Sequence, residues 1–285
     1  MASDGALSTT QECHLWVLPP EKKHVEELCE EGRGLLCQEE RVRYQAMRNP
    51  LAARRFLLGR CLLRVGLARH LGAKPEELKF GYQAKGKPVL RHPAVKGLCF
   101  NLSHSGEEVV LAIAQCCALG IDIEARSRGA RVLRIAERFF PLAEHQQISS
   151  RPEGSESTAL KHWVLKESVI KAVGDSVWDA LTSVCLDTSG PDLDWLLPPP
   201  DGNEENWTLM VGPFRKNYVL AVALRSASGW SGKAIRFRNH VLGQGESMSL
   251  LFSPEMRTRH PISQQNTVGS SLPSCGSTRC ICDVS

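Results

Sequence analysis

Two acidic residues at the end of one segment raise the question of a metal site. The stretch GIDIE ends with Asp122 and Glu124, and residues two apart on a β-strand point to the same side. Carboxylates held that close repel each other, and a hard divalent cation such as Mg²⁺ is their simplest neutraliser. A later stretch, WVLKESVIKAVG, sets Glu167 and Lys171 one helical turn apart, so Glu167 would be the natural third ligand.

Each of these features also has an ordinary explanation. A glutamate followed by a lysine four residues later is a common helix-stabilising ion pair, worth roughly 0.2–0.5 kcal/mol. Two acids at a strand end are more often solvent-exposed edge residues than metal ligands. The surrounding elements and motifs therefore have to decide between surface charges and a metal site.

The hydrophobic periodicity predicts the elements that would position these side chains. Leu165, Val169, Ala172 and Val173 form the core-facing stripe of a helix over 163–174. The other predicted elements are a helix from Leu51 to Leu71 that stops at Gly72, a hairpin of LCFNLSHS and VVLAIA that turns at Ser105 and Gly106, a strand ending at Glu124, an amphipathic helix over 131–140, a loop from Ser149 to Ser157 and a closing strand over 217–225.

These elements divide into two halves, each with a helix and antiparallel strands. We therefore expect an α+β protein built as a pseudo-repeat, with a boundary near Gln115 to Ala118. The expected domains are 1–115 and 116–228, followed by a tail, 229–285. The tail is rich in Ser, Gly, Arg and Gln and has little periodicity, which favours disorder. One alternative stays open, because Lys233 to Leu242 alternates at strand period and could dock as an extra strand.

The net charge of +4 is too small to indicate a nucleic-acid-binding protein, but the positive charge is unevenly distributed. Between Glu39 and Arg64 the only acids are Glu39 and Glu40, whereas the bases are Arg41, Arg43, Arg48, Arg54, Arg55, Arg60 and Arg64. The ordinary interpretation of such a run is a solvated helix face, and the functional one is an anion site. Because no RNA-binding aromatic motif accompanies it, a small phosphorylated ligand is favoured and no nucleic-acid partner is expected.

The chain has 285 residues, 42% of them hydrophobic, and can bury a core without disulfides. Its start, MASDGALSTT, lacks the features of a signal peptide, and its longest apolar run, Val109 to Ile121, is too short to cross a bilayer. Most of the 11 cysteines lie in apolar segments, where reduced thiols behave as small hydrophobes; they include Cys61, Cys99, Cys116 and Cys117. We expect a cytoplasmic protein with no membrane partner and no disulfide framework.

Four segments taken together resemble the surfactin-type 4'-phosphopantetheinyl transferases. They are KGKPVL (85–90), FNLSHS (100–105), GIDIE (120–124) and WVLKESVIK (163–171), in the order of the family. Every fixed position of the family patterns Gly-Lys-Pro, Phe-Asn-x-Ser-His, Gly-Ile/Val-Asp-x-Glu and Trp-x-x-Lys-Glu-Ser/Ala-x-x-Lys is present. The resemblance runs from about His14 to Arg225. It implies a fold in which two similar α/β halves form a pseudo-dimer within one chain.

The resemblance also implies a reaction. The phosphopantetheine arm of coenzyme A would be transferred to a serine hydroxyl of an apo acyl or peptidyl carrier protein, releasing adenosine 3',5'-bisphosphate. Such an attack needs neutralised phosphate charge and a proton acceptor. Asp122, Glu124 and Glu167 would hold Mg²⁺ against the pyrophosphate, and Glu167 would accept the serine proton directly or through water. Because a carboxylate tightly bound to a metal is a poorer base, the choice between these two roles of Glu167 stays open.

The same resemblance assigns the basic segments to coenzyme A. The residues that would contact its nucleotide end are Arg55, Gly86, Lys87, Pro88, Ser103 and His104. Lys171 would contact the pyrophosphate as a catalytic point charge, and Lys166 is a further candidate for that role. On its own, His104 beside a hairpin turn would be interpreted as a surface histidine, and Pro88 as a strand-entry residue. Asn101 could equally shape the hairpin through backbone hydrogen bonds.

Two other functions remain open. A Mg²⁺-dependent hydrolase would use the same acids to cleave a nucleotide pyrophosphate with water, although it would not explain the order of the four motifs. A non-catalytic interaction protein on the same fold is the other alternative, and the intact acid triad argues against it. No motif indicates which carrier or pathway is served. Because two fused halves can build the cleft without a partner chain, we expect a monomer.

Overall fold

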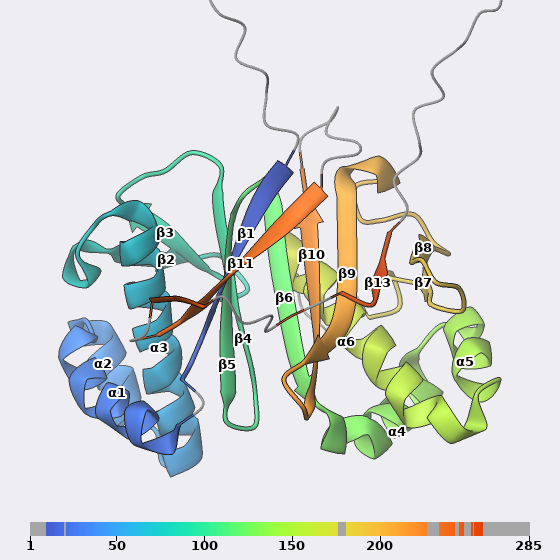
Figure 1. Cartoon of the computed structure of the whole chain (residues 1–285), viewed down its shortest axis with the longest axis horizontal. Coiled ribbons are helices and arrows are strands. Elements are labelled where there is room, and N and C mark those ends of the chain that lie inside the picture. The colour runs from blue at the N-terminus through green and yellow to red at the C-terminus, as the bar shows by residue number, and fades with distance from the viewer. Residues whose placement is uncertain are drawn as a thin grey trace, which may run out of the picture.

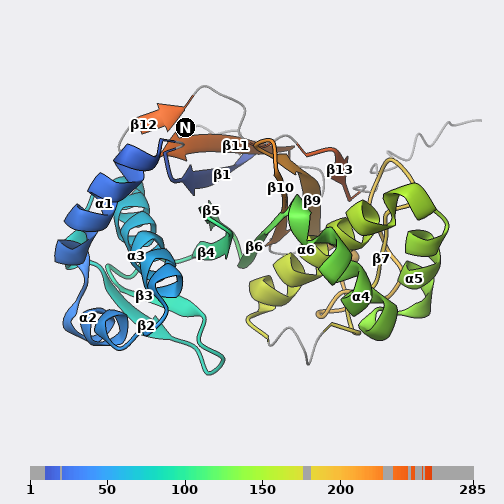
Figure 2. The same cartoon turned by 90° about the horizontal axis from the view of Figure 1, so that it is seen from below.

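The computed structural model describes residues 10–19, 21–175, 181–226, 234–242, 245–247, 252 and 254–258. Two β-sheets pack face to face in the centre, and helices cover their outer faces (Figures 1 and 2). One outer layer contains α3, Pro50–Leu71, and the other contains α6, Ser155–Val173. This arrangement of helix, sheet, sheet and helix confirms the predicted α+β class.

Each half supplies its own helices and strands. The first half contains β1 (Thr10–Val17), α1 (Lys22–Leu35), α2 (Gln38–Gln45), α3, β2 (Lys79–Tyr82), β3 (Pro88–His92), β4 (Leu98–Ser105) and β5 (Glu108–Gln115). The second half contains β6 (Ala118–Ala125), α4 (Gly129–Phe139), α5 (Leu142–Ser149), α6, β7 (Leu186–Asp187), β8 (Asp194–Trp195), β9 (Trp207–Phe214) and β10 (Tyr218–Arg225). The last strands are β11 (Ala234–Val241), β12 (Gly245–Ser247) and β13 (Met256–Arg257).

Both halves use the same strand connectivity. The five-stranded sheet has the order β12-β11-β1-β5-β4, and the four-stranded sheet has the order β13-β9-β10-β6. β1 and β6 each begin a half and precede its main helices. Each then pairs antiparallel with the second strand of a hairpin, β1 with β5 and β6 with β10. This repeated topology confirms the predicted pseudo-repeat, and the predicted boundary falls between β5 and β6.

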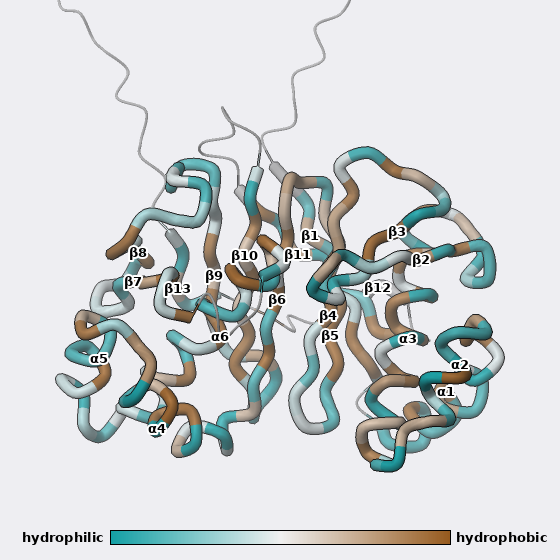
Figure 3. The backbone as a smooth tube through the Cα atoms, turned by 180° about the vertical axis from the view of Figure 1, so that it is seen from behind, coloured by the Kyte–Doolittle hydropathy of each residue, from teal (hydrophilic) through white to brown (hydrophobic). Residues whose placement is uncertain are grey.

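Alternation along the central strands builds separate hydrophobic cores. On β5, Val110 faces the space between the two sheets, whereas Leu111 packs in the core that contains α3. On β10, Leu220 lies between the sheets and Ala221 packs in the core that contains α6. Because each strand packs on a sheet with one face and on a helix with the other, hydrophobic residues dominate the central strands (Figure 3).

Local chemistry sets both ends of α3. The Asn49 side chain accepts hydrogen bonds from the backbone N–H groups of Leu51 (3.0 Å) and Ala52 (3.1 Å), which the first turn leaves without helical partners. Pro50 occupies the first turn, and Gly72 closes the helix in a left-handed conformation with φ of 65°. The predicted helix and its stop at Gly72 are therefore confirmed.

The second main helix, α6, is longer than predicted. It begins at Ser155, directly after a 3-10 turn at Pro152–Gly154, so the predicted loop from Ser149 to Ser157 is too long. Leu165, Val169 and Ala172 are buried, as predicted. Val173 is 37% exposed, because it is the last residue of the helix and lies beyond the packed face.

The expectation of disorder is wrong for part of 229–285. Ala234–Val241 forms β11, which pairs parallel with β1 along its full length. Ile235 and Phe237 pack against the core between the sheets. The edge of β1 offers unpaired backbone groups, and an alternating segment can satisfy them while burying its apolar side. The alternative of an extra strand is therefore the observed one; residues 259–285 lie outside the described residues.

Ending the chain at residue 229 is expected to lower the melting temperature by about 6–12 °C. The shorter chain loses β11, β12 and β13, of which β11 has the longest pairing. A loss of about 3 kcal/mol shifts the melting temperature by roughly 2–4 °C per kcal/mol. Thermal unfolding followed by circular dichroism measures this. A chain ending at Thr258, which keeps every described strand, is the matched control. Equal melting temperatures for both truncated chains would show that β11 does not stabilise the fold.

Two features bear on the expected environment. No helix within the described residues is both long and apolar enough to cross a membrane. The described cysteines are free thiols: Cys61 is buried, Cys99 and Cys116 are partly buried, and Cys117 is exposed. The expectation that Cys117 is buried is therefore wrong, because this residue lies in the short connection between β5 and β6, where its side chain is exposed.

Candidate active site

The candidate site lies where the edges of the two sheets meet. β4 is the last strand of one sheet and β6 is the last strand of the other, and the two strands contact each other. No backbone ladder joins them; instead, alternate side chains of β4 accept hydrogen bonds from backbone N–H groups of β6. These pairs are Asn101 Oδ1 with Ile121 (3.0 Å), Ser103 Oγ with Ile123 (3.3 Å) and Ser105 Oγ with Ala125 (3.0 Å).

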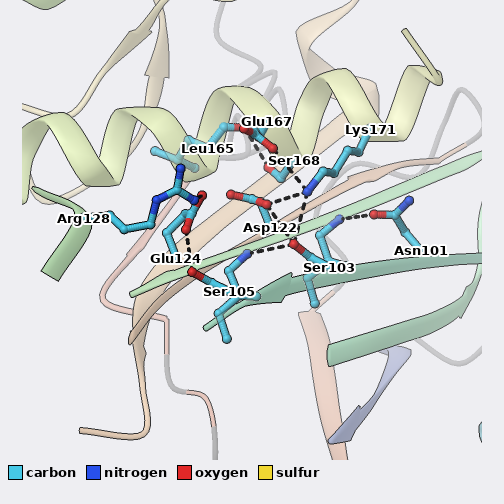
Figure 4. Close-up of polar contacts among 12 residues, drawn as sticks. Asn101, Ser103, Ser105, Asp122, Glu124, Arg128, Leu165, Glu167, Ser168 and Lys171 are labelled. Atoms are coloured by element: carbon cyan, nitrogen blue, oxygen red, sulfur yellow. Dashed lines mark hydrogen bonds and ion pairs between the residues drawn. The ribbon is translucent and has the colours of Figure 1, made fainter. Parts of the chain in front are cut away.

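We call this junction of β4 and β6, made by Asn101, Ser103 and Ser105, the seam. Its two serines also hold the acidic residues. Ser103 Oγ donates to Asp122 Oδ1 at 2.8 Å, and Ser105 Oγ donates to Glu124 Oε2 at 2.6 Å (Figure 4). Each hydroxyl group therefore accepts a hydrogen bond from a backbone N–H of β6 and donates one to a carboxylate of the same strand. The register between β4 and β6 fixes both acids, which are almost fully buried, at 2% and 5% exposed.

Gly120, on β6, allows α6 to pack closely against that strand. A Cβ atom at Gly120 would lie 1.8 Å from the carbonyl oxygen of Ser168 and 2.6 Å from the backbone nitrogen of Ala172. Only a residue without a side chain allows that approach. The helix therefore lies close enough for Glu167 to join the acids of β6. Ligand oxygens of Asp122, Glu124 and Glu167 all lie within 4.8 Å of one another.

Lys171 neutralises part of this cluster. Its Nζ lies 2.5 Å from Asp122 Oδ1 and 3.2 Å from Glu167 Oε2, and donates to Ser103 Oγ at 3.1 Å. Burial disfavours the charged lysine, but the carboxylates of Asp122 and Glu167 overcome this effect and raise its pKa. Burial also raises the pKa of Asp122, as does the charge of Glu167, while Lys171 acts in the opposite direction. Glu167 and Lys171 are thus part of one charged cluster with Asp122 and do not form an isolated surface ion pair.

Glu124 has an additional partner. Arg128, at the end of a short 3-10 turn after β6, pairs with Glu124 Oε1, while Ser105 binds the other oxygen. Sequence reasoning missed both partners. The spacing of two residues between Ser103 and Ser105 could have identified Ser105, because it places both hydroxyls on one strand face. No pattern in the sequence distinguishes Arg128 from its basic neighbours.

The acidic cluster fits a hard divalent cation. Asp122 Oδ2 is buried and has no hydrogen-bond partner among the described residues, and this would be costly for a carboxylate oxygen that never meets a cation. Glu167 is partly exposed, at 13% of its side chain, which leaves an approach from solvent. Carboxylate oxygens are the ligands that Mg²⁺ prefers. Asp122, Glu124 and Glu167 are therefore the residues that would hold such an ion.

Two predicted nucleotide contacts approach the cluster from the first half. Arg55 lies on α3 and His104 on β4, next to the seam residue Ser103. The pKa of His104 is lowered mainly by its partial burial and, to a smaller extent, by the positive charges of Arg55 and Lys171. Arg55 and Lys171 therefore act on the same region as the His104 ring. Arg55 also lines a pocket of about 340 Å³ between α1, α3 and the turn after β4.

The predicted Gly-Lys-Pro contact spans the end of the loop between β2 and β3 and the first residue of β3. Gly86 occupies a turn position with φ of 84°, and Pro88 lines a second pocket, of about 180 Å³, together with Lys87. The ammonium of Lys87 does not point freely into this pocket. Its Nζ donates to backbone carbonyls of Leu119, Lys171 and Ala172.

The prediction for Lys166 is wrong. Its side chain is fully buried, and its Nζ pairs with Glu144 Oε2 at 2.6 Å and donates to the carbonyl of Val184. Neighbouring residues on a helix point about 100° apart, so Lys166 leaves the helix on a different side from Glu167. It is a buried structural cation of the second half and does not reach the acidic cluster.

The comparisons with known proteins agree with this arrangement. Residues 118–223 match the family model described as the 4'-phosphopantetheinyl transferase superfamily. Residues 28–116 match a second model, described as the N-terminal part of 4'-phosphopantetheinyl transferase. The two matched segments together contain the acidic residues, their seam partners and the basic residues of the first half.

Curated relatives come from bacteria and mammals. A Synechocystis sp. protein named as a provisional 4'-phosphopantetheinyl transferase is 30% identical over 217 residues, covering 73% of this chain and 85% of the relative. The 4'-phosphopantetheinyl transferase HetI of Nostoc sp. is 34% identical over 170 residues, covering 59% of this chain and 71% of the relative. The human L-aminoadipate-semialdehyde dehydrogenase-phosphopantetheinyl transferase is 32% identical over 200 residues, covering 62% and 63%. With its repeated fold and this acidic seam, the chain belongs to the 4'-phosphopantetheinyl transferase superfamily and is an enzyme of that class.

Proposed function

We propose that the protein transfers the 4'-phosphopantetheine arm of coenzyme A to a serine hydroxyl of an apo carrier protein, depends on Mg²⁺ and releases adenosine 3',5'-bisphosphate. We assign it to the surfactin-type branch on its four motifs. The observation that carries the proposal is the meeting of Asp122, Glu124 and Glu167 beside Lys171. Three acids and a lysine at one point suit a pyrophosphate held through a divalent cation.

The proposed chemistry uses side chains of both halves. The serine oxygen of the carrier attacks the phosphorus on the pantetheine side of the pyrophosphate, and the bond to the nucleotide phosphate breaks. When bound at the three acids, Mg²⁺ would neutralise charge that develops on the phosphate oxygens. Lys171 would donate to the same oxygens, because its Nζ already lies at the acidic cluster. Glu167 would receive the serine proton, directly or through water, as it is the most exposed of the three acids.

The basic residues of the first half are proposed to bind the nucleotide end of coenzyme A. Arg55, His104 and Ser103 lie on α3 and β4, across the seam from Glu167. Gly86, in the loop between β2 and β3, and Pro88, the first residue of β3, are proposed to contact the same end. Since one chain supplies both sides of this site, we propose that the enzyme acts as a monomer. Size-exclusion chromatography with light scattering at the assay concentration tests the monomer.

Mass spectrometry of apo carrier proteins tests the reaction. Several carriers, of the fatty-acid, polyketide, peptide and aminoadipate types, are incubated with the enzyme, coenzyme A and Mg²⁺. We expect a mass increase of one phosphopantetheine on at least one carrier, and its loss when EDTA replaces Mg²⁺. Incubation with coenzyme A alone is the control. Release of nucleotide without a carrier would indicate the Mg²⁺-dependent hydrolase instead.

Arg55→Ala is expected to raise the KM for coenzyme A about tenfold, because a charge-assisted contact to a phosphate contributes about 1.5–3 kcal/mol. For 3'-dephospho-coenzyme A, which lacks the nucleotide-end phosphate, the KM is expected to change little. Steady-state kinetics with both substrates measures the difference. Arg134→Ala, which removes an exposed arginine of α4, is the control. An equal rise for both substrates would mean that Arg55 does not contact that phosphate.

A further inference from the structure

We propose that Lys87 is a positioning residue that clasps the C-terminal end of α6 and thereby holds Lys171 at the acidic cluster. The inference rests on the proposed function for its catalytic consequence, but its structural part does not. Lys87 lies at the end of the loop 83–87 between β2 and β3, in the first half of the chain, whereas α6 belongs to the second half. The clasp therefore connects the two halves beside the site.

The ammonium of Lys87 has three N–H donors, and three carbonyl oxygens accept them. The distances from Nζ are 2.6 Å to Lys171 O, 2.9 Å to Ala172 O and 3.2 Å to Leu119 O. The side chain is thereby fully engaged within the protein. A lysine used in this way has no donor left for a phosphate of coenzyme A, so its contribution to the site has to be indirect.

The end of α6 needs such a partner. The last carbonyl groups of a helix have no intrahelical donor, and the helix dipole places partial negative charge on them. In α6 the backbone N–H groups of Gly174 and Asp175 both donate to Ile170 O, so neither of these two described groups satisfies the carbonyls of Lys171 and Ala172. Lys87 satisfies both and adds a positive charge at the favourable end of the dipole. Because one of these carbonyls belongs to Lys171 itself, the clasp acts directly on the backbone that carries the catalytic side chain.

The rest of the loop is shaped to dock on the same helix end. Gln83 N–H donates to Lys87 O and Gly86 N–H donates to Gln83 O, both at 2.9 Å, which fixes the loop conformation. Lys85 forms an ion pair with Asp175, directly after the helix. Gly174, which ends α6 with φ of 80°, faces the loop, because a Cβ there would lie 2.7 Å from Gln83 Oε1 and 3.6 Å from Lys87 Cδ. Loop and helix end therefore fit each other at three separate points.

Amide hydrogen exchange of the Lys87→Met variant tests the clasp without any assay of activity. Methionine keeps the length of the side chain but removes the ammonium. We expect exchange at residues 170–175 to accelerate about tenfold or more, as charged hydrogen bonds are lost. Lys79→Met, which removes an exposed lysine at the other end of the same hairpin, is the matched control and should leave exchange in α6 unchanged. Unchanged protection of this turn in Lys87→Met would overturn the proposal.

Kinetics separate a positioning role from a phosphate contact. In Lys87→Met, kcat is expected to fall, and kcat/KM for coenzyme A and for 3'-dephospho-coenzyme A should fall by the same factor. A larger loss for coenzyme A than for the dephospho compound would assign Lys87 to the phosphate and overturn the clasp. If the wild-type enzyme transferred no phosphopantetheine at all, the proposed function would fail, but the exchange experiment would still decide on the clasp.

A milder variant covers the case in which Lys87→Met does not fold. Lys85→Met breaks the ion pair with Asp175 and leaves Lys87 in place; because the two paired side chains are 47% and 39% exposed, the fold should persist. Exchange at residues 170–175 is expected to accelerate about two- to threefold, in line with a partly exposed ion pair. No acceleration in a folded Lys85→Met protein would show that the loop does not restrain the end of α6.

Discussion

Asp122→Asn is expected to lower kcat/KM for carrier modification about a thousandfold, equivalent to about 4 kcal/mol of transition-state stabilisation. The variant keeps the shape and the hydrogen bond from Ser103 but removes a charge from the cluster that would hold Mg²⁺. The fold should survive, because burial of Asp122 disfavours its charge and Lys171 keeps Glu167 as a partner. We expect the melting temperature to stay within about 3 °C of the wild type.

Two measurements test this prediction. Initial rates with a carrier protein give kcat/KM, and thermal unfolding with and without Mg²⁺ shows whether the ion binds. Mg²⁺ should raise the melting temperature of the wild type, since a ligand bound only to the folded state stabilises it, and this rise should disappear in the variant. Asp194→Asn makes the same chemical change at an exposed acid and is the control. Near-normal turnover in folded Asp122→Asn protein would refute the metal assignment.

Gly120→Ala is expected to destabilise the protein by about 3 kcal/mol, because overpacking where the backbone cannot yield is costly. The added methyl group would lie 1.8 Å from Ser168 O, a backbone atom that can move only if α6 moves. The same displacement would carry Glu167 and Lys171 away from Asp122. We therefore expect transfer activity to fall by more than tenfold even at temperatures at which the variant is folded.

Chemical denaturation and steady-state kinetics on one preparation measure both effects. Gly34→Ala is the matched control, because a Cβ at Gly34, on the exposed side of α1, would meet no atom within 4 Å. Alanine is the better helix former, so this control should be as stable as the wild type or slightly more stable. If Gly120→Ala unfolded at the wild-type denaturant concentration, the close approach of β6 and α6 would not be a tight constraint.

The sequence by itself determined the local elements and the chemistry they carry. Asn49, Pro50 and Gly72 mark the ends of α3, and the hairpin of β4 and β5 is where the alternation predicts it. The spacing of Asp122 and Glu124 placed both carboxylates on one face of a strand. These features depend on residues a few positions apart, so local stereochemistry is enough to predict them.

Only the tertiary structure decided what lies opposite these residues. Lys166 and Glu167 are neighbours in one helix, yet Glu144, 22 residues away, draws the lysine into the interior while the glutamate joins the acids of β6. β11 became a strand because the edge of β1, distant in sequence, could accept it. Ser105, Arg128 and Lys87 likewise took their roles from partners on other elements. Periodicity describes which side of an element is apolar, but the pairing of distant edges, helix ends and buried charges is set by packing of the whole chain.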